Sequence, residues 1–197
     1  AIIEITPNDC SLYFPEDDIV IGPNHFQSDA FKDSELNLED MAESSSVYRY
    51  ERMTELINRY DTIGYSEAAE ILRDKRGLND IDIGMGNEKN ICQLISHHAV
   101  IFKPDELKIW ISTNPFQLGK FVCYDLDSVF AKFPGTEINQ EIYEEELSIN
   151  SDPFKETDDF RNYQEFRKKA NEIKALIKNE YSLNKEESEI EAFIATN

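Results

Sequence analysis

Residues 91–112, ICQLISHHAVIFKPDELKIWIS, decide the fold class of this chain. Two apolar stretches rich in β-branched residues flank the tetrapeptide Lys103-Pro104-Asp105-Glu106, which has the composition of a hairpin loop. A third stretch of the same character, KFVCYDL at 120–126, follows closely. We therefore predict an antiparallel group of strands in this part of the chain.

Two helices are predicted on the N-terminal side of these strands. The serines at 44–46 form a cluster of possible N-cap residues, and Ser66 begins a second helical pattern, SEAAEILRD at 66–74, with Ala69 and Leu72 facing inward. The apolar positions that share one side of the first helix are Tyr50, Met53, Leu56, Ile57 and Tyr60.

Short strands are also predicted at the beginning of the chain, at Ala1–Ile5, Ser11–Phe14 and Asp18–Ile21. Proline-containing turns separate them, and this spacing is typical of an antiparallel meander. Strands, then helices, then strands again indicate an α+β fold rather than alternating βαβ units.

The composition changes after Pro134-Gly135, where β-branched residues become rare. We predict a main domain over residues 1–136 and an acidic helical extension over 137–197, with helices at about 153–181 and 185–195. The apolar positions of this extension are expected to pack on the main domain, and a partner-binding arm is the alternative.

The charge of the chain excludes two classes of partner. Its 197 residues carry a formal net charge of -20, which repels nucleic acid and anionic membrane surfaces. No apolar run is long enough to span a bilayer. The three cysteines form no CxxC pair and are expected to be buried thiols in strands, so no metal site and no cofactor is predicted. The cysteines leave the cellular compartment of the protein open.

The pentapeptide Gly22-Pro23-Asn24-His25-Phe26 follows the predicted strand Asp18–Ile21 without the charged turn that usually ends a strand. Asn24 suits a surface turn, because asparagine tolerates positive φ angles. No GxSxG, GxxxxGK[ST] or GxGxxG motif accompanies it. Spacing alone therefore leaves the function open.

A pair of histidines, His97 and His98, lies within the predicted strand of 91–102. Adjacent residues of a strand point to opposite faces, so the two cannot bind one metal ion without a bulge. We expect one of them to be buried and His98 to face the site, because it shares a strand face with Ser96 and Val100.

Several motifs occur here in an order that resembles a known enzyme family. They are GPNHF at 22–26, SSSVYRYERM at 44–53, SEAAEILRD at 66–74, ICQLISHHAVIFKPDELKIWIS at 91–112 and QLGKFVCYDL at 117–126. Residues 1–130 resemble the C-terminal part of the C45-type autoproteolytic acyltransferases and hydrolases, the acyl-coenzyme A:6-aminopenicillanic acid acyltransferase-like proteins. The chain is more distantly similar to choloylglycine hydrolases and acid ceramidases.

The resemblance implies an αββα N-terminal-nucleophile (Ntn) hydrolase, in which autoproteolysis exposes a cysteine that attacks an acyl amide or acyl thioester. Asn24 matches the family's oxyanion donor, and Arg49 matches an arginine that organises the site. For Arg49 an ion pair with Glu51 or Glu55 is the alternative role, and Arg52 is a competing candidate one turn on. His25 and His98 are the expected substrate contacts.

The family's cysteine nucleophile would lie before Ala1, which cannot act as a nucleophile. The sequence therefore predicts a fragment or processed chain that is inactive alone and works with a missing N-terminal segment. The alternative function is a non-catalytic interaction module that uses the acidic helical extension.

Overall fold

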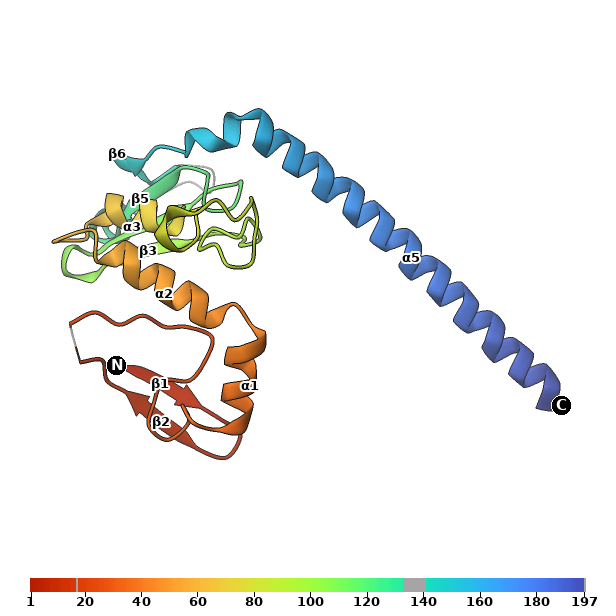
Figure 1. The fold of residues 1–197 in the computed structure, drawn as a ribbon. Coiled ribbons are helices and arrows are strands. Elements are labelled where there is room, and N and C mark those ends of the chain that lie inside the picture. The colour runs from red at the N-terminus through yellow and green to blue at the C-terminus, as the bar shows by residue number, and fades with distance from the viewer. Residues whose placement is uncertain (17, 133–140, 197) are drawn as a thin grey trace. The chain divides into compact units, whose positions relative to one another are not determined.

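The computed structural model describes the backbone of residues 1–16, 18–132 and 141–196, and the side chains of residues 1–16, 18–131 and 141–178. The chain forms two compact units, which divide between Asp152 and Pro153. The first unit mixes helices with antiparallel sheets, as Figure 1 shows, and confirms the predicted α+β class at this level.

The first unit contains four α-helices and six strands in its described residues. In chain order they are β1 (Ile2–Ile5), β2 (Cys10–Tyr13), α1 (Glu35–Glu43), α2 (Ser46–Ile57), α3 (Tyr65–Leu72), β3 (Val100–Lys103), β4 (Lys108–Ser112), β5 (Phe121–Asp125), α4 (Leu126–Lys132) and β6 (Glu144–Ile149).

The larger sheet has the strand order β3-β4-β5-β6, with all neighbours antiparallel. Lys103 pairs with Lys108 across the predicted hairpin loop, which confirms that connection. Trp110 of β4 and both Phe121 and Cys123 of β5 are fully buried, and they form a core with Ala69 of α3. Helix α3 thus covers one face of this sheet.

Strand β6 was not predicted, and it moves the boundary between the two units. It pairs with β5, and its Leu147 carbonyl accepts a hydrogen bond of 2.8 Å from the Trp110 indole. Lys75 also forms a 2.6 Å ion pair with Asp152. The division therefore falls after residue 152 and not at 136/137, because residues 144–152 complete the sheet of the first unit.

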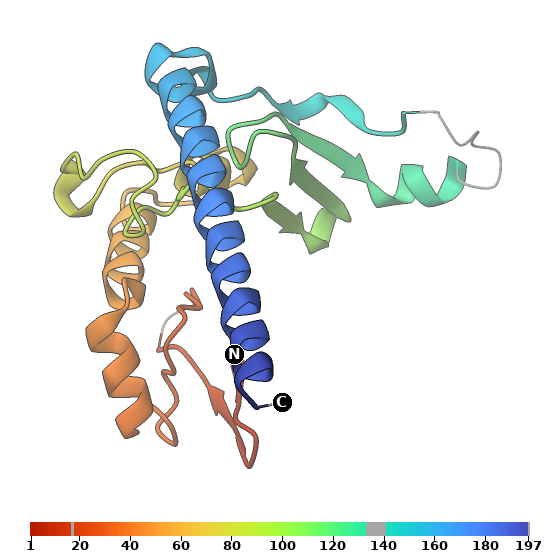
Figure 2. The same cartoon turned by 90° about the vertical axis from the view of Figure 1, so that its right-hand side faces the viewer.

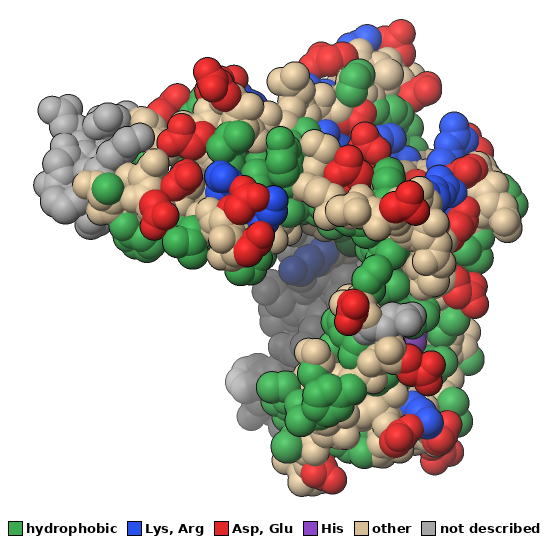
Figure 3. Space-filling view, turned by 90° about the vertical axis from the view of Figure 1, so that its left-hand side faces the viewer, with side chains coloured by type: hydrophobic (Ala, Val, Ile, Leu, Met, Phe, Trp, Pro, Cys, Tyr) green, Lys and Arg blue, Asp and Glu red, His purple; other side chains and the backbone are tan. Residues whose placement is uncertain are grey.

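The two-stranded sheet β1-β2 replaces the predicted three-stranded meander. Residues 18–21 form no strand, and Ile19 and Val20 are 48% and 40% exposed, so the predicted buried strand there is wrong. One face of the β1-β2 hairpin is apolar and exposed, and hydrophobic side chains gather in the lower part of Figure 3, where the hairpin lies. The exposed residues are Ile3, Ile5, Leu12 and, just past β2, Phe14.

Residues 90–99 form an irregular segment in place of the predicted strand, which begins only at Val100. Leu94 has a positive φ angle of 56° that interrupts any extended run. Cys92 and Leu94 are both fully buried, and the Cys92 amide donates to the Asp74 carbonyl. The apolar character of this segment reflects burial without strand pairing.

An ion-pair cluster fixes α2 to the residues that follow α3. The Arg52 side chain is fully buried and donates two hydrogen bonds to the Asp74 carboxylate, of 3.0 and 2.8 Å. It also pairs with Asp80 at 2.8 Å and with Glu55 at 2.9 Å. Arg52 therefore has a structural role and is withdrawn as a candidate for the site.

The second unit consists of a 3₁₀ turn at Pro153–Glu156 and helix α5, Asp158–Thr196. Figure 2 shows α5 as one continuous helix, where the sequence had predicted two helices with a break near residue 183. The expected break, residues 182–184, reads Ser-Leu-Asn and contains neither proline nor glycine, so it has no residue that would stop the helix.

Candidate functional site

The turn that carries Asn24 is anchored to the first residue of α2. The Asn24 backbone N–H donates to the Ser46 hydroxyl at 2.9 Å, and the same hydroxyl forms a 2.8 Å hydrogen bond with Nδ1 of His25. Ser46 is buried. One serine therefore fixes two consecutive residues of the turn against the start of the helix.

Two further elements hold the residues after Asn24. The Glu4 carboxylate of β1 accepts the backbone N–H groups of Gln27 and Ser28 at 2.6 and 2.9 Å. Asn37 of α1 accepts the Phe26 N–H at 2.8 Å and donates back to the Phe26 carbonyl. Burial by itself raises the pKa of Glu4, but its hydrogen bonds outweigh burial and lower it. The turn is thus held by β1, α1 and α2 together.

Arg49 brings the two predicted catalytic residues into contact. Its Nη2 donates a 2.8 Å hydrogen bond to Oδ1 of Asn24, and its Nη1 donates to the Glu88 carbonyl at 2.9 Å. A guanidinium group can only donate, so the Asn24 atom that faces it must be the oxygen. Nδ2 of Asn24 keeps both of its N–H groups free of any hydrogen bond within the described residues.

Glu88 fixes the other side of Arg49. Its carbonyl also accepts a 2.8 Å hydrogen bond from Gln93 Nε2, and its carboxylate accepts one from the Ser45 hydroxyl, also at 2.8 Å. Ser45 precedes α2 but its side chain makes no helix-cap hydrogen bond, contrary to the expectation for the serine cluster. Ser45 instead joins the start of α2 to the segment that contains Glu88, and Ser46 joins it to the turn of Asn24 and His25.

Asn24 and Arg49 line one hollow of about 350 Å³. The wall also includes Tyr50 of α2, Ile91 and Ser96, and it lies open to solvent on the side of Asn24, which is itself exposed. The family resemblance had implied that Asn24 and Arg49 belong to one site. The structure brings together these two residues, which lie 25 positions apart.

His25 lies on a second, smaller hollow of about 200 Å³ that Asn24 also lines, together with residues 2–5 of β1. Burial lowers the pKa of the imidazole, although the carboxylates of Asp40 and Glu4 act in the opposite direction. His25 therefore borders the site through the neighbouring hollow, and it does not line the hollow that contains Arg49.

His98 lines neither hollow, so these hollows do not support its role as a substrate contact, which stays a prediction. Both His97 and His98 are exposed and lie before β3, so the expected alternation across a strand does not apply. Ser96, from the same segment, does line the hollow with Arg49.

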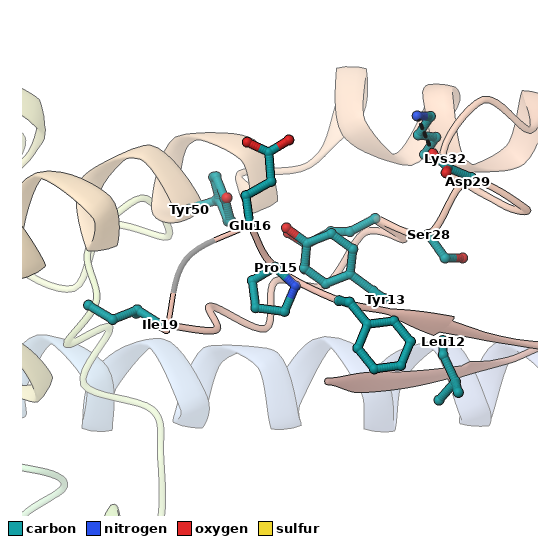
Figure 4. A pocket seen from close by; sticks show the side chains of 11 residues that line it. Leu12, Tyr13, Pro15, Glu16, Ile19, Ser28, Asp29, Lys32 and Tyr50 are labelled. Atoms are coloured by element: carbon teal, nitrogen blue, oxygen red, sulfur yellow. Dashed lines mark hydrogen bonds and ion pairs between the residues drawn. The ribbon is translucent and has the colours of Figure 1, made fainter.

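A third hollow, of about 550 Å³ and therefore larger than the two above, lies between β2 and α2 and is shown in Figure 4. Its charged side chains include Lys32 and Asp29, which pair with one another at 2.5 Å. Tyr50 extends from α2 on the side opposite Ile19 and Tyr13. The lining also includes the hydroxyl groups of Tyr13 and Tyr50 and the Glu16 carboxylate, but it contains neither Asn24 nor Arg49.

None of the three cysteines is placed to act as a nucleophile at this site. Burial raises the pKa of Cys92 to about 11 and also raises the pKa of Cys123. Cys10 is exposed but lies on the β1-β2 hairpin, away from the residues that line the hollow. Cys92 lies outside any strand, unlike Cys10 and Cys123, so the expectation of three buried strand thiols holds only for Cys123.

The described residues contain no group of three His, Cys, Asp or Glu side chains placed to hold a metal ion. None of the helices in the described part of the chain is both long and apolar enough to cross a membrane.

No protein-family model, curated protein or solved structure matches the chain. No relative therefore supports a function, and the geometry of the Asn24–Arg49 pair is the observation from which one can be proposed. Sequence reasoning missed Ser46 and Glu88 as members of this site. Ser46 had a signal in the serine cluster at 44–46, whereas Glu88 had none, because Arg49 contacts its backbone carbonyl.

Proposed function

We propose that this chain is the C-terminal portion of an Ntn amidohydrolase or acyltransferase of the C45 type, with an αββα sandwich completed by residues outside these 197. The site would act on an acyl amide or acyl thioester. The observation that carries the proposal is the 2.8 Å hydrogen bond from Arg49 to Oδ1 of Asn24, because it fixes the Asn24 amide while the donor nitrogen has no hydrogen-bond partner among the described residues.

A fixed amide donor suits acyl transfer for a specific reason. When a thiolate attacks the carbonyl carbon, the C=O π electrons move to the oxygen, and negative charge appears that is absent from the ground state. Nδ2 of Asn24 can donate to this oxyanion without rearrangement, because Arg49 already holds the other end of the amide. Collapse of the intermediate expels the amine or thiol and leaves an acyl-enzyme, which water or an amine then cleaves.

Arg49 contributes in two ways to this arrangement. It orients Asn24, and its positive charge lies beside the position where the oxyanion would form. The Glu88 carbonyl limits the positions of the Arg49 side chain, because it accepts a hydrogen bond from Nη1. The Ser45 hydroxyl in turn donates to the Glu88 carboxylate and so holds Glu88 in place. The guanidinium thus acts as a positioning group for the amide donor.

The nucleophile in this proposal is a cysteine supplied from outside the chain, since Cys92 and Cys123 are buried with raised pKa values. The isolated chain is therefore expected to hydrolyse no amide, ester or thioester above background. The test is a panel of acyl amides and thioesters incubated with the repurified chain. Turnover that cysteine alkylation abolishes would assign the nucleophile to Cys10, Cys92 or Cys123 and refute this part of the proposal.

The decisive comparison uses the complete gene product. A cysteine after a self-cleavage point upstream of Ala1, and turnover of the same panel by that protein, would support the proposal. A complete product with no such cysteine would favour the interaction module.

An interaction role for the helical extension has one observation in its favour. The second unit is compact by itself, and its helix α5 exposes a set of large apolar side chains. These are Phe166, Ile173, Leu176 and Ile177. Such residues could bind a partner whether or not the first unit is catalytic.

A further inference from the structure

Helix α5 is much longer than the element that packs on it within the second unit. It has 39 residues, and a helix of that number is about 58 Å long. The 3₁₀ turn at Pro153–Glu156 packs on its first turn, where the rings of Phe154 and Phe160 lie 5.9 Å apart. Because helices in proteins owe most of their stability to packing of an apolar face, the rest of α5 requires a partner surface.

A row of apolar residues runs along the described side chains of α5 beyond this turn. Its large residues are Phe166, Ile173, Leu176 and Ile177, and each is more than half exposed. Ile173 follows Phe166 by seven residues, and the other two follow Ile173 by three and four, so all four lie on one face of the helix. We call these four residues the α5 stripe.

The α5 stripe follows the seven-residue repeat of a coiled coil, abcdefg, in which positions a and d form the seam between paired helices. With Phe166 at position a, nine a and d positions fall between residues 166 and 194, and six of them are apolar. The a positions are Phe166, Ile173, Glu180, Glu187 and Ile194, and the d positions are Lys169, Leu176, Leu183 and Ile190. A seam of this composition indicates that α5 pairs with another helix.

Charges of opposite sign dominate the two halves of α5. Residues 161–178 contain six Lys or Arg and two Glu, whereas residues 179–196 contain one Lys and five Glu. The remaining charges, Asp158 and Asp159, lie in the first turn, where carboxylates interact favourably with the helix dipole. An antiparallel pair of α5 helices therefore brings the basic half of each copy beside the acidic half of the other, and a parallel pair brings like charges together.

One antiparallel register also matches the charged positions of the seam. This register sets opposite one another Phe166 and Ile190, Ile173 and Leu183, Leu176 and Glu180, and Lys169 and Glu187. Lys169 of each copy is thus opposite a glutamate of the other. In a parallel pair, Lys169, Glu180 and Glu187 would instead each face the same residue of the other copy, and three layers of the seam would hold like charges. The seam therefore favours the antiparallel direction.

The negative charge of the chain resides mainly outside the second unit. Residues 153–197 contain eight Lys or Arg and ten Asp or Glu, so they account for only -2 of the formal net charge of -20. Each first unit precedes α5 in the chain, so an antiparallel pair attaches the two acidic first units at opposite ends. That separation, about the length of α5, exceeds the Debye length of about 8 Å at physiological ionic strength. Repulsion between the first units therefore does not prevent the pairing.

We propose that the α5 stripe binds the α5 helix of a second copy of this chain, in a two-fold symmetric antiparallel coiled coil. The partner in this inference is the chain itself. Dimerisation goes beyond the proposed function, because it needs neither Asn24 nor a nucleophile. Packing of the α5 stripe on the first unit and binding of a different protein are the alternatives that the test separates.

Sedimentation equilibrium of the full 197-residue chain measures the dissociation constant of the dimer. Over about 1 to 100 µM, which covers weak specific association, the mass should rise from 22.8 kDa towards twice that value. A mass of 22.8 kDa throughout this range would overturn the proposal and would assign the α5 stripe to the first unit or to a different protein.

Ile173→Glu tests the α5 stripe, and Asn171→Glu is its matched control. Each adds one negative charge to the same turn of α5, but Asn171 is exposed at position f, which faces away from the seam. Ile173→Glu should raise the dissociation constant at least about tenfold, because both copies then bury an unpaired carboxylate, whereas Asn171→Glu should change it less than about threefold. Equal effects of the two substitutions would overturn the role of the α5 stripe. If Ile173→Glu lowers the helix content seen by circular dichroism, the charge reversal below decides.

Reversal of the seam charges tests the direction of the pair. In the antiparallel register, Lys169→Glu and Glu187→Lys each set like charges opposite one another. Each should therefore raise the dissociation constant about tenfold, and the double variant should restore it to within about threefold. Lys169→Glu also removes an exposed ion pair with Glu165, which contributes little to stability.

A parallel pair gives a different result. Each residue then faces its own counterpart, so like charges oppose one another before and after either single substitution, and the dissociation constant hardly changes. That outcome, or a double variant that dimerises as weakly as the single variants, would overturn the antiparallel arrangement.

Discussion

Asn24 accepts a hydrogen bond from Arg49 through its oxygen, so its nitrogen is directed away from Arg49 and can donate to a ligand. In the enzyme that we propose, Asn24→Ala should lower kcat by roughly 10² to 10³, with little change in KM, as loss of one oxyanion donor usually does. Asn24→Asp should lower kcat further, because it keeps an oxygen for Arg49 but repels the developing negative charge. Steady-state kinetics measures both.

The matched control for these variants is Asn8→Ala, at an exposed asparagine in the turn between β1 and β2. It should leave kcat and KM unchanged. Near-native kcat for Asn24→Ala would reduce Asn24 to a turn residue and remove the main support for catalysis.

His25 makes the stability of the first unit depend on pH. Its pKa is lowered in the folded state, chiefly by burial, so the unfolded chain binds a proton first as the pH falls. Its contribution to stability is present above the ordinary histidine pKa of about 6.5 and is lost as the pH falls through that value towards the folded-state pKa.

His25→Gln should therefore flatten the change in the free energy of unfolding between pH 7.5 and 5. Urea denaturation at several pH values measures it, and an exposed-site variant, His97→Gln, serves as the control. If the free energy of unfolding depends on pH in the same way in the unchanged chain, in His25→Gln and in His97→Gln, His25 is not responsible for that dependence.

At the scale of residues, the site was predictable only through family resemblance. Asn24 and Arg49 are 25 positions apart, and no periodicity joins a turn to a helix over that distance. The contribution of Glu88 could not be predicted at all, because Arg49 binds a backbone carbonyl that every residue type possesses.

Among the elements, α2 depends most on a buried charge. Arg52→Met should destabilise the first unit by about 3–5 kcal/mol, because the carboxylate of Asp74 stays buried without its partner. Arg59→Met is the matched control, since Arg59 pairs with Glu55 and Asp80 but is partly exposed. Its loss should cost at most about 1 kcal/mol.

Urea denaturation followed by tryptophan fluorescence compares the two arginine variants, because Trp110 is the single tryptophan and lies in the core. Equal losses of stability in Arg52→Met and Arg59→Met would contradict the expectation that removing the buried arginine costs more than removing the partly exposed one.

The elements that were predicted correctly have clear periodic patterns. Helices α2 and α3 and strands β4 and β5 alternate or repeat their apolar residues as their geometry requires. The errors have physical causes. Residues 91–99 are apolar because Cys92 and Leu94 are buried in an irregular segment, and β6 was missed because its sequence, EEELSI, is acidic and lacks the expected β-branched composition.

For the whole molecule, the position of the unit boundary gives the clearest test. A chain of residues 1–152 should remain folded, because it keeps β6 and the ion pair between Lys75 and Asp152. A chain of residues 1–136 should be strongly destabilised, since it removes the strand that pairs with β5 and leaves the Trp110 N–H without its acceptor.

Thermal unfolding of the two truncated proteins and the full chain checks this expectation. A cooperative transition for residues 1–136 at the temperature found for residues 1–152 would refute a structural role for β6. If residues 1–152, within the enzyme that we propose, also keep full kcat, then the second unit is dispensable for catalysis.

The β1-β2 hairpin has a consequence for measurements of amide exchange. A two-stranded sheet is marginally stable by itself, and the face with Ile3 and Leu12 is in contact with solvent. Its backbone amides should therefore exchange with deuterium far sooner than those of Trp110 and Cys123 in the buried sheet. Since β1 also carries Glu4, which holds the Asn24 turn, slower exchange in the hairpin after addition of the N-terminal segment of our proposal would report that the turn has been consolidated as well.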